Sequence, residues 1–400
     1  MRFSEIAGET GIFVDGDWIE KKDQDAKGAV RLIQLADVGP GEFRDKSDRH
    51  ITVEKADELH CTFLRKGDIL IARLGDPLCK ACVFPLDGLY ITAVDVAILR
   101  IGSDVVNPKY LIYLLNSPWF KDQVKQYESG TTRKRISRKN LDRIEMIFPP
   151  LPEQERIVSR IEELFSQLDA GVETLKKTKA QLSVYRQAAI TEAFSVENNT
   201  PNVCLSDIAQ IIGGITKGRD LSGTETIELP YLRVANVQNG YLDLSEIKTI
   251  KLRVDEKERY LLKPGDVLYT EGGDRDKLGR GTVWRGEIKD CVHQNHVFKA
   301  RVDQSKAIPE YVAFWSMSTP ARNYFYQKGK QSVNLASINK TVLSALTLPL
   351  PALEKQREII NHIESRLSVC DSIEQTVDTA LQQAEAMRQS ILTQAFGGAL

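Results

Sequence analysis

The stretch RQAAITEAF, residues 186–194, returns as RQSILTQAF at residues 388–396. This repetition decides how the chain is divided. When residues 355–396 are aligned without gaps on residues 153–194, 13 of the 42 pairs are identical. Unrelated segments of ordinary composition would share about two or three. The same helical ending is therefore written twice, about half the chain apart.

Weaker matches extend the repetition toward the N-terminal side of each copy. The matching segments are KGDIL (66–70) with PGDVL (264–268), LIQLADV (32–38) with YLRVANV (231–237), and PLPEQ (150–154) with PLPALEKQ (349–356). The sequence therefore predicts two tandem repeats of roughly 200 residues, and any function must account for the duplication.

The composition is that of an ordinary soluble protein, with 42% hydrophobic and 27% charged residues among 400. A signal peptide and apolar runs of about eighteen residues are absent, so we expect a cytoplasmic protein. Six cysteines fit a reducing compartment better than a disulfide framework. Because the net charge is −1, a nucleic-acid partner would have to meet a local basic patch.

Each repeat has a strand-rich front part and a long helical back part. Short runs such as DILIARL (68–74) and DVLYTEG (266–272) lie between Gly, Pro and Asp, which predicts strands. The segments 107–120 and 308–320 are typical of helices that begin at a proline. We therefore expect an α+β fold.

The back parts carry apolar residues every seven positions, as in a coiled coil. The predicted seam consists of Ile157, Ile161, Leu168, Leu175, Leu182 and Ala189 in the first copy and Ile359, Ile363, Cys370, Val377, Ala384 and Ile391 in the second. A 42-residue helix would be about 63 Å long, too long to pack inside one small domain. We expect the two helices to pair as an antiparallel coiled coil, related by a pseudo-twofold axis. The alternative is two amphipathic helices, each docked on its own domain.

The order of these parts resembles the specificity subunit of type I restriction-modification enzymes, across essentially the whole chain. The motifs that carry the resemblance are GDIL and GDVL, PPLPEQERIV and PLPALEKQREII, and the paired RQ(A/S)..T.AF endings. The resemblance implies two target recognition domains, residues 1–150 and 198–348, each reading one half of a split DNA site. It also implies two conserved spacer helices, residues 151–197 and 349–400.

The same resemblance implies the partners. In the family the helices set the spacing of the half-sites and hold two methyltransferase subunits, and restriction subunits join the full complex. We expect docking near Gln154, Arg186 and Phe194 and near their counterparts Gln356, Arg388 and Phe396. The second copy departs from the pattern, with Ala352 and Leu353 inserted and Lys355-Gln356 in place of Glu-Gln. The two methyltransferase contacts therefore need not be equally strong.

The residues themselves point to DNA as well. Residues 131–140 of the first repeat, TTRKRISRKN, contain no acid but five cations: Arg133, Lys134, Arg135, Arg138 and Lys139. Clustered Arg and Lys neutralise phosphates, and Arg can also pair with guanine. The segment we match to it in the second repeat keeps Lys328, Lys330, Gln331 and Asn334, whose amides suit adenine edges. A solvated basic loop is the alternative interpretation.

A second set of candidates lies in the Gly-rich loops after the GDIL and GDVL strands. These loops carry Arg73 and Lys80 in the first repeat and Arg275, Lys277 and Arg280 in the second. Glycines let the backbone approach a phosphate closely, although a plain hairpin would look the same. Further DNA-binding candidates in the second repeat are Lys217, Arg219 and Arg233.

Several catalytic and metal motifs are incomplete. GGITKGRD (213–220) has Arg219 and Asp220 where a phosphate loop needs Lys and Ser or Thr. Cys79 and Cys82, with His60 and Cys61 upstream, have zinc-like spacing. The positions we match to these two cysteines in the second repeat are Lys277 and Arg280, which favours buried thiols. His293 and His296 are discounted similarly.

We therefore expect a non-catalytic subunit that binds no cofactor or metal itself. Neither a methyltransferase signature nor a convincing nuclease spacing is present, so S-adenosylmethionine, ATP and magnesium would belong to partner subunits. The main alternative is a coiled-coil scaffold with two protein-binding end domains, which would leave the basic segment unexplained. A stand-alone nuclease or methyltransferase is a third hypothesis, which the missing motifs disfavour.

Overall fold

A computed structural model of the chain describes residues 1–195, 200–331 and 336–397. These residues form two compact units. Unit 1 contains Met1–Leu175 and Thr379–Leu400, and unit 2 contains Lys176–Asp378. Each compact unit thus includes a piece of both long helices, whereas the predicted division separates the two helical segments, 151–197 and 349–400, from the two front domains. That four-segment division stays a prediction.

Unit 1 is built on two small sheets. The first has the order β1-β7-β4-β5 and is antiparallel throughout, and the second has the order β3-β2-β6, in which β2 and β6 are parallel. The strands are β1 (Ile12–Val14), β2 (Val30–Ile33), β3 (His50–Ile51), β4 (Ile69–Ala72), β5 (Ala81–Val83), β6 (Tyr90–Thr92) and β7 (Val96–Arg100). The short helices are α1 (Phe3–Ala7), α2 (Val53–Glu58), α3 (Pro108–Asn116), α4 (Pro118–Lys125) and α5 (Arg138–Leu141).

Unit 2 repeats this plan. Its first sheet has the order β9-β16-β12-β14 and its second the order β11-β10-β15, again with one parallel pair, β10 with β15. The strands of these sheets are β9 (Ala209–Gly213), β10 (Thr226–Leu232), β11 (Lys248–Arg253), β12 (Asp266–Thr270), β14 (Gly281–Val283), β15 (Val292–His293) and β16 (Val297–Val302). The short strands outside them are β8 (Asn202–Cys204), β13 (Gly272–Gly273), β17 (Lys330–Gln331), β18 (Ala336–Ser337) and β19 (Thr347–Pro349). The short helices are α7 (Leu205–Ile208), α8 (Lys257–Tyr260), α9 (Pro309–Met317), α10 (Thr319–Lys328) and α11 (Lys340–Ser344).

The central strand β4 is buried on both faces, which explains its unbroken apolar sequence. Ile69 and Ile71 face the core that contains α3 and α4, whereas Leu70 and Ala72 face a second core around Phe84. In unit 2, Val267 and Tyr269 of β12 face the α9 side, and Leu268 packs with Trp284. Alternate side chains of a strand point to opposite faces, so each central strand joins two cores.

The GDIL and GDVL motifs have a structural explanation. Gly67 and Gly265 adopt φ of 94° and 91°, a region that strongly favours glycine. The following carboxylates, Asp68 and Asp266, are each 1% exposed. Arg100 pairs with Asp68 through Nε and Nη2 at 2.8 and 2.7 Å. Arg301 pairs with Asp266 at the same two distances, so both motifs anchor β4 or β12 to the neighbouring strand.

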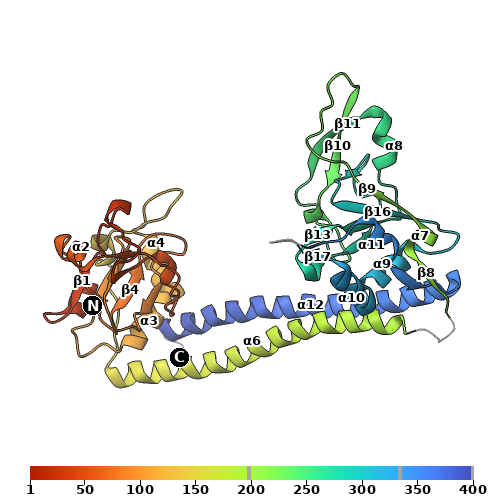
Figure 1. Ribbon diagram of the computed structural model, residues 1–400. Coiled ribbons are helices and arrows are strands. Elements are labelled where there is room, and N and C mark those ends of the chain that lie inside the picture. Colours follow the sequence, from red (N-terminus) through yellow and green to blue (C-terminus); the bar gives the residue numbers. More distant parts are fainter. Residues whose placement is uncertain (196–199, 332–335, 398–400) are drawn as a thin grey trace. The chain divides into compact units, whose positions relative to one another are not determined.

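The long helices are α6 (Leu151–Ala193) and α12 (Leu353–Phe396), the two long ribbons in Figure 1. In unit 1 the beginning of α6 packs with the end of α12, so that Ile157 and Ile161 share a core with Ile391 and Leu392. In unit 2 the end of α6 and the beginning of α12 share a core through Ile190 and Ile363. Within each unit the two segments therefore run in opposite directions, as predicted.

The predicted seam is buried at most of its positions. Ile161 and Ile363 are 0% exposed, and Cys370, Val377, Ala384, Leu182 and Ala189 are also buried; Leu168 and Leu175 are half-buried. Complete burial of an isoleucine side chain stabilises a fold by about 1.5–3 kcal/mol. The α+β class, with two strand-rich parts and two long helices, is confirmed. Within the part of the chain that the structure describes, none of the helices has the length and hydrophobicity to cross a bilayer.

Candidate nucleic-acid interface

The two candidate segments of unit 1, predicted separately, lie against each other. The loop after β4 and residues 134–136 are joined by main-chain hydrogen bonds: Gly75 N donates to Lys134 O and Ile136 N donates to Arg73 O, both at 3.0 Å. We call this place the hairpin junction of unit 1, comprising residues 73–80 and 129–140. The hairpin and the basic segment therefore form one surface.

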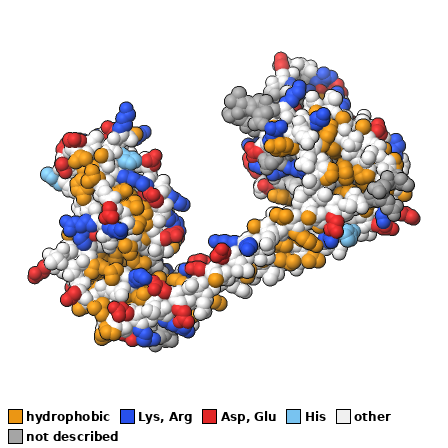
Figure 2. Space-filling model, turned by 60° about the horizontal axis from the view of Figure 1, so that its bottom comes forward, with side chains coloured by type: hydrophobic (Ala, Val, Ile, Leu, Met, Phe, Trp, Pro, Cys, Tyr) orange, Lys and Arg blue, Asp and Glu red, His pale blue; other side chains and the backbone are white. Residues whose placement is uncertain are grey.

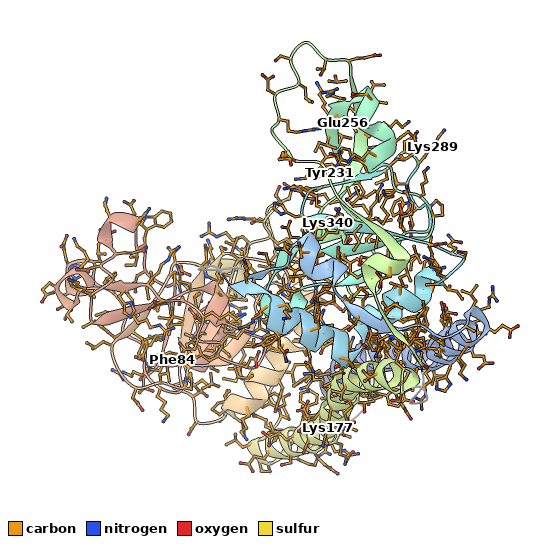
Figure 3. The ribbon with its side chains drawn as sticks, turned by 45° about the vertical axis from the view of Figure 1, so that its right-hand side comes forward. Phe84, Lys177, Tyr231, Glu256, Lys289 and Lys340 are labelled. Atoms are coloured by element: carbon orange, nitrogen blue, oxygen red, sulfur yellow. The ribbon has the colours of Figure 1, made fainter. Side chains whose placement is uncertain are left out.

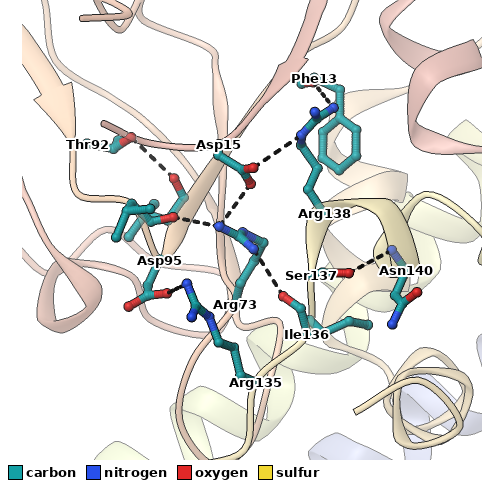
Figure 4. A network of polar contacts seen from close by, with 12 residues as sticks. Phe13, Asp15, Arg73, Thr92, Asp95, Arg135, Ile136, Ser137, Arg138 and Asn140 are labelled. Atoms are coloured by element: carbon teal, nitrogen blue, oxygen red, sulfur yellow. Dashed lines mark hydrogen bonds and ion pairs between the residues drawn. The ribbon is translucent and has the colours of Figure 1, made fainter. Parts of the chain in front are cut away.

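Arg73 lies beneath this surface, in the network of Figure 4. Its side chain is 4% exposed and pairs with Asp15 at 2.9 Å. Its guanidinium also donates to Ile136 O at 3.1 Å and to Val94 O at 2.6 Å. The prediction that Arg73 contacts DNA is therefore corrected: its donors hold the β4 end, Asp15 and the basic segment together.

The five cations of residues 131–140 fall into two groups. Three have internal acidic partners: Lys134 with Glu128 at 3.1 Å, Arg135 with Asp95 at 2.9 Å and Arg138 with Asp15 at 3.4 Å. All five except Lys134 are exposed, and among the residues that the structure describes Arg133 and Lys139 form no ion pair with an acid. On the face shown in Figure 2, Lys and Arg side chains are likewise interspersed with Asp and Glu. Arg133 and Lys139 are thus the members of the segment best placed for phosphates.

Unit 2 has an equivalent junction with fewer cations. Gly272 and Gly273 of β13 pair with Ser337 and Ala336 of β18, and Ile338 N donates to Glu271 O at 2.8 Å, as Ile136 N does to Arg73 O. The hairpin junction of unit 2 comprises residues 271–280 together with 330–331 and 336–340. Lys340 starts α11 (Figure 3) and is exposed. It is the counterpart of Arg138 and was missed by sequence reasoning, although it lies 202 positions further on.

The predicted cations of unit 2 are dispersed around this junction. Arg275 stacks on the Tyr326 ring at 4.4 Å, Lys277 pairs with Asp274, and Arg280 donates to Gln238 Oε1 at 3.1 Å. Lys328 and Lys330 are exposed. Asn334 lies outside the described residues, as does the side chain of Gln331.

A groove of about 390 Å³ runs beside this junction. Its lining includes Gln238, Thr270, Gly272, Lys277 and Arg280. The groove combines two cations, an amide and glycine backbone, which are groups that contact phosphates and base edges; it is also lined by Asp274, the partner of Lys277. Gln238 was missed by sequence reasoning because it belongs to the turn after β10, which is distant in the chain from the segments of the junction.

Three further candidates of unit 2 are not part of the junction segments. Arg219 makes a bidentate pair at 2.9 Å with Glu256, which is labelled in Figure 3. Arg233 bonds Glu246 O at 3.0 Å and pairs with its carboxylate at 3.1 Å. Lys217 is exposed. Arg219 and Arg233 thus each hold a glutamate within unit 2, and DNA contact by either residue stays a prediction.

The predicted partner-binding residues serve internal roles. Gln154 is 0% exposed; it accepts from Asn107 N at 2.9 Å and donates to Val105 O and Pro149 O. Gln356 is also 0% exposed and repeats this bonding with Ile308 N, Lys306 O and Pro351 O. The prediction that these two amides meet a partner is corrected: each one ties the start of a long helix to its unit.

The arginines and phenylalanines of the repeated ending also face inward. Arg186 pairs with Asp371 at 2.7 Å and Arg388 pairs with Asp169, each joining α6 to α12 within one unit. The Phe194 ring contacts Trp315 at 5.2 Å, and the Phe396 ring contacts Tyr110 at 5.3 Å. The repeated ending is therefore explained by helix pairing and by docking onto each unit.

The cysteine pair is buried, and burial raises the pKa of Cys79 to about 11 and of Cys82 to about 12. Their counterparts in the strand register are Gly279 and Thr282 rather than Lys277 and Arg280, a shift of two residues. The conclusion that the fold does not require a metal here is unchanged. His293 is buried and bonds Val297 O at 2.6 Å. Among the residues that the structure describes, His, Cys, Asp and Glu side chains do not gather in groups of three or more suited to a metal.

Comparisons with known proteins agree with this organisation. The model of the type I restriction modification DNA specificity domain matches residues 11–183 and 198–383. The StySPI specificity subunit of Salmonella potsdam is 26% identical over 74% of this chain and 66% of its own length. The EcoKI specificity subunit of Escherichia coli strain K12 is 25% identical over 73% of this chain and 65% of its own length. The chain thus spans just under two thirds of these relatives.

Two solved structures share the fold. A chain from a study of complex assembly and conformational transition of the type I R-M system superposes with a TM-score of 0.68 at 18% identity, covering 100% of this chain and 97% of that one. The HsdS subunit from Thermoanaerobacter tengcongensis superposes with a TM-score of 0.51 at 17% identity, covering 97% of each chain.

Proposed function

The chain belongs to the type I restriction modification DNA specificity family, and we propose that it reads a split DNA target and brings partner methyltransferase subunits to it. Each unit reads one half of the target through its hairpin junction. The observation that carries the proposal is the duplication itself: both units keep the same two sheets and the same junction bonds but differ in the polar side chains that the junction presents.

Phosphate contacts and base contacts fall to different residues in this proposal. Arg133 and Lys139 in unit 1 and Lys328, Lys330 and Lys340 in unit 2 are exposed and suit phosphates. Gln238 and Arg280 meet at the groove of unit 2, where an amide and a guanidinium can read base edges. Binding of DNA by both units would make each unit read its own sequence, as a split target requires.

Catalysis in this proposal belongs to partner subunits. S-adenosylmethionine would bind to two methyltransferase subunits, and ATP and magnesium to restriction subunits. The long helices of unit 2 expose Tyr185, Val369 and Ile373 around a hollow of about 330 Å³. Such apolar patches are typical of protein contacts, which supports docking on this helix pair rather than on the buried glutamines.

The decisive experiment is methylation mapping. The chain is co-expressed with its partner methyltransferase, and the genome is sequenced by a method that detects modified bases. We expect a split methylated motif, and exchange of residues 1–150 for those of a relative should alter only one half of it. A scaffold with protein-binding end domains would leave the genome unmodified and would show no salt-dependent affinity for duplex DNA.

A further inference from the structure

The hairpin of each unit is held from below by a cation of a neighbouring helix. In unit 1, Lys121 of α4 donates from Nζ to Cys79 O at 2.6 Å. In unit 2, Arg322 of α10 donates from Nη1 to Leu278 O at 3.1 Å. Both cations stand four residues after the cap serine of their helix, Ser117 or Ser318. The two cations therefore stand at equivalent places and hold the same loop, although their carbonyl acceptors are one residue apart, because the counterpart of Cys79 is Gly279.

The loop backbone at this point is equivalent as well. Cys79 and Gly279 both have positive φ, 58° and 64°. Cys79 N donates to Ala72 O at 2.8 Å, and Gly279 N donates to Thr270 O at 3.3 Å. A non-glycine residue such as Cys79 rarely adopts this conformation unless its surroundings fix it. The bond from Lys121 to the Cys79 carbonyl is one such restraint.

The residue that follows the positive-φ position is a cation in both units, Lys80 or Arg280. The Lys80 carbonyl accepts from Ala72 N at 2.9 Å and the Arg280 carbonyl accepts from Thr270 N at 3.1 Å, so the two residues share a place in the hairpin. Both side chains are half-buried and lie at the junction. In both loops this cation stands two positions after a leucine, Leu78 or Leu278.

The Lys121 side chain is half-buried, and this burial lowers the pKa of its ammonium to about 8. The charged groups that act on it are the Cys79 thiol and Lys80. A charged donor meeting a carbonyl in such surroundings makes a strong hydrogen bond. Loss of this donor would leave the loop backbone free to move, and Lys80 would move with it.

We propose that Lys121 and Arg322 are positioning residues for DNA binding, each fixing the hairpin backbone so that Lys80 or Arg280 faces the DNA. This inference rests on the proposed function. Lys121 and Arg322 lie below the junction surface and do not contact DNA themselves. They affect DNA binding only by fixing the hairpin. Arg322 has further interactions besides this bond, so the cleaner test is in unit 1.

The test measures affinity of the full chain for random-sequence duplex DNA by fluorescence anisotropy. Lys121→Met keeps the length of the side chain but removes the donor, and we expect about tenfold weaker binding, equivalent to about 1.4 kcal/mol. Lys121→Arg restores a donor of the kind found in unit 2 and should bind within about twofold of wild type. Thermal unfolding of each variant checks that the fold is retained.

A double-mutant cycle separates positioning from a general structural role. Lys80→Ala should weaken binding, and in that background Lys121→Met should have no additional effect, because the side chain it positions is gone. Additive losses, or a Lys121→Met variant that binds like wild type, would overturn the inference. A wild-type chain without DNA affinity would instead overturn the proposed function.

Discussion

The two hairpin junctions share a backbone and differ in charge. Ile136 N bonds Arg73 O in unit 1 and Ile338 N bonds Glu271 O in unit 2. Arg73 pairs with Asp15 beneath the junction, whereas Glu271 pairs with His296 at 2.8 Å. The main-chain bonds do not depend on side-chain identity, so polar residues around them can change without loss of the frame.

The exposed part of the junction differs even more. Where unit 1 carries Lys134, Arg135, Arg138 and Lys139, unit 2 carries Ala336, Ser337, Lys340 and Thr341. Three of the unit 1 cations are held by acids. The number of cations in a sequence therefore overstates how many are free of internal ion pairs and available to DNA. Comparing the two units shows at which positions of the junction the cations differ.

The largest expected effect tests the shared frame. Asp68→Ala or Asp266→Ala should lower the free energy of unfolding by about 3–5 kcal/mol, because Arg100 or Arg301 would lose its buried partner. Urea unfolding of the full chain measures the loss. The exposed Asp87, which pairs with Lys66 at 3.6 Å, is the control, and Asp87→Ala should change stability by less than about 1 kcal/mol. Equal effects at both kinds of site would contradict the structural role of the GDIL and GDVL motifs.

A second prediction concerns the buried amides at the helix starts. Gln154→Ala and Gln356→Ala should each destabilise the chain by about 1–3 kcal/mol, because buried backbone groups would lose their partners. Binding to the methyltransferase subunit, measured by native mass spectrometry below the unfolding transition, should be unchanged. The exposed Gln167 on α6 serves as the matched control. A folded Gln154→Ala protein that no longer binds the subunit would restore the original prediction of a partner contact.

The third prediction is an opposite pH dependence in the two units. Burial raises the pKa of Asp17 to about 6 and lowers the pKa of His293 to about 4. Between about pH 4 and 6 the folded state holds the extra proton at Asp17, so this contribution to stability falls as pH rises. At His293 the unfolded state holds the extra proton, so its contribution rises over about pH 4 to 6.5.

These slopes can be separated by substitution. Asp17→Asn should stabilise the protein at pH 7 by about 1 kcal/mol, and His293→Gln should remove a loss of about 2 kcal/mol between pH 6.5 and 4. Urea unfolding at several pH values measures both. In the strand register the counterpart of Asp17 is Ile215 and the counterpart of His293 is Thr92. Neither counterpart has a titratable side chain, so each slope should disappear with a single substitution. If the pH dependence of stability is unchanged in either variant, the residue substituted in that variant is not the group responsible for the slope.

The smallest effect concerns the charge difference between the junctions. Lys139→Ala should weaken specific and random DNA alike by about 1 kcal/mol or less and lower the salt slope by about one unit. Thr341→Lys, at the matched position of unit 2, should raise the slope by a similar amount. Affinity measured across a salt series provides the readout. If neither substitution changes the slope, these surfaces do not meet phosphates.

The sequence by itself determined the duplication, the α+β class and the seam of the long helices, because these follow from local pattern and heptad spacing. Burial of Ile161 and Ile363 confirms the seam. The motifs GDIL and GDVL were recognised as repeated, but their reason, a buried carboxylate facing Arg100 or Arg301, depends on a partner strand more than thirty residues away.

Only the tertiary structure decided which polar residues are available to a partner. Arg73, Arg219 and Arg233 looked like free cations, and Gln154 looked like part of a docking motif. Each has partners distant in the chain, and burying a charge or an amide requires such partners. The same long-range packing brought the hairpin to the basic segment and placed Lys121 and Arg322 beneath it. Local sequence does not contain these distances, since they arise only when separate strands and helices share one core.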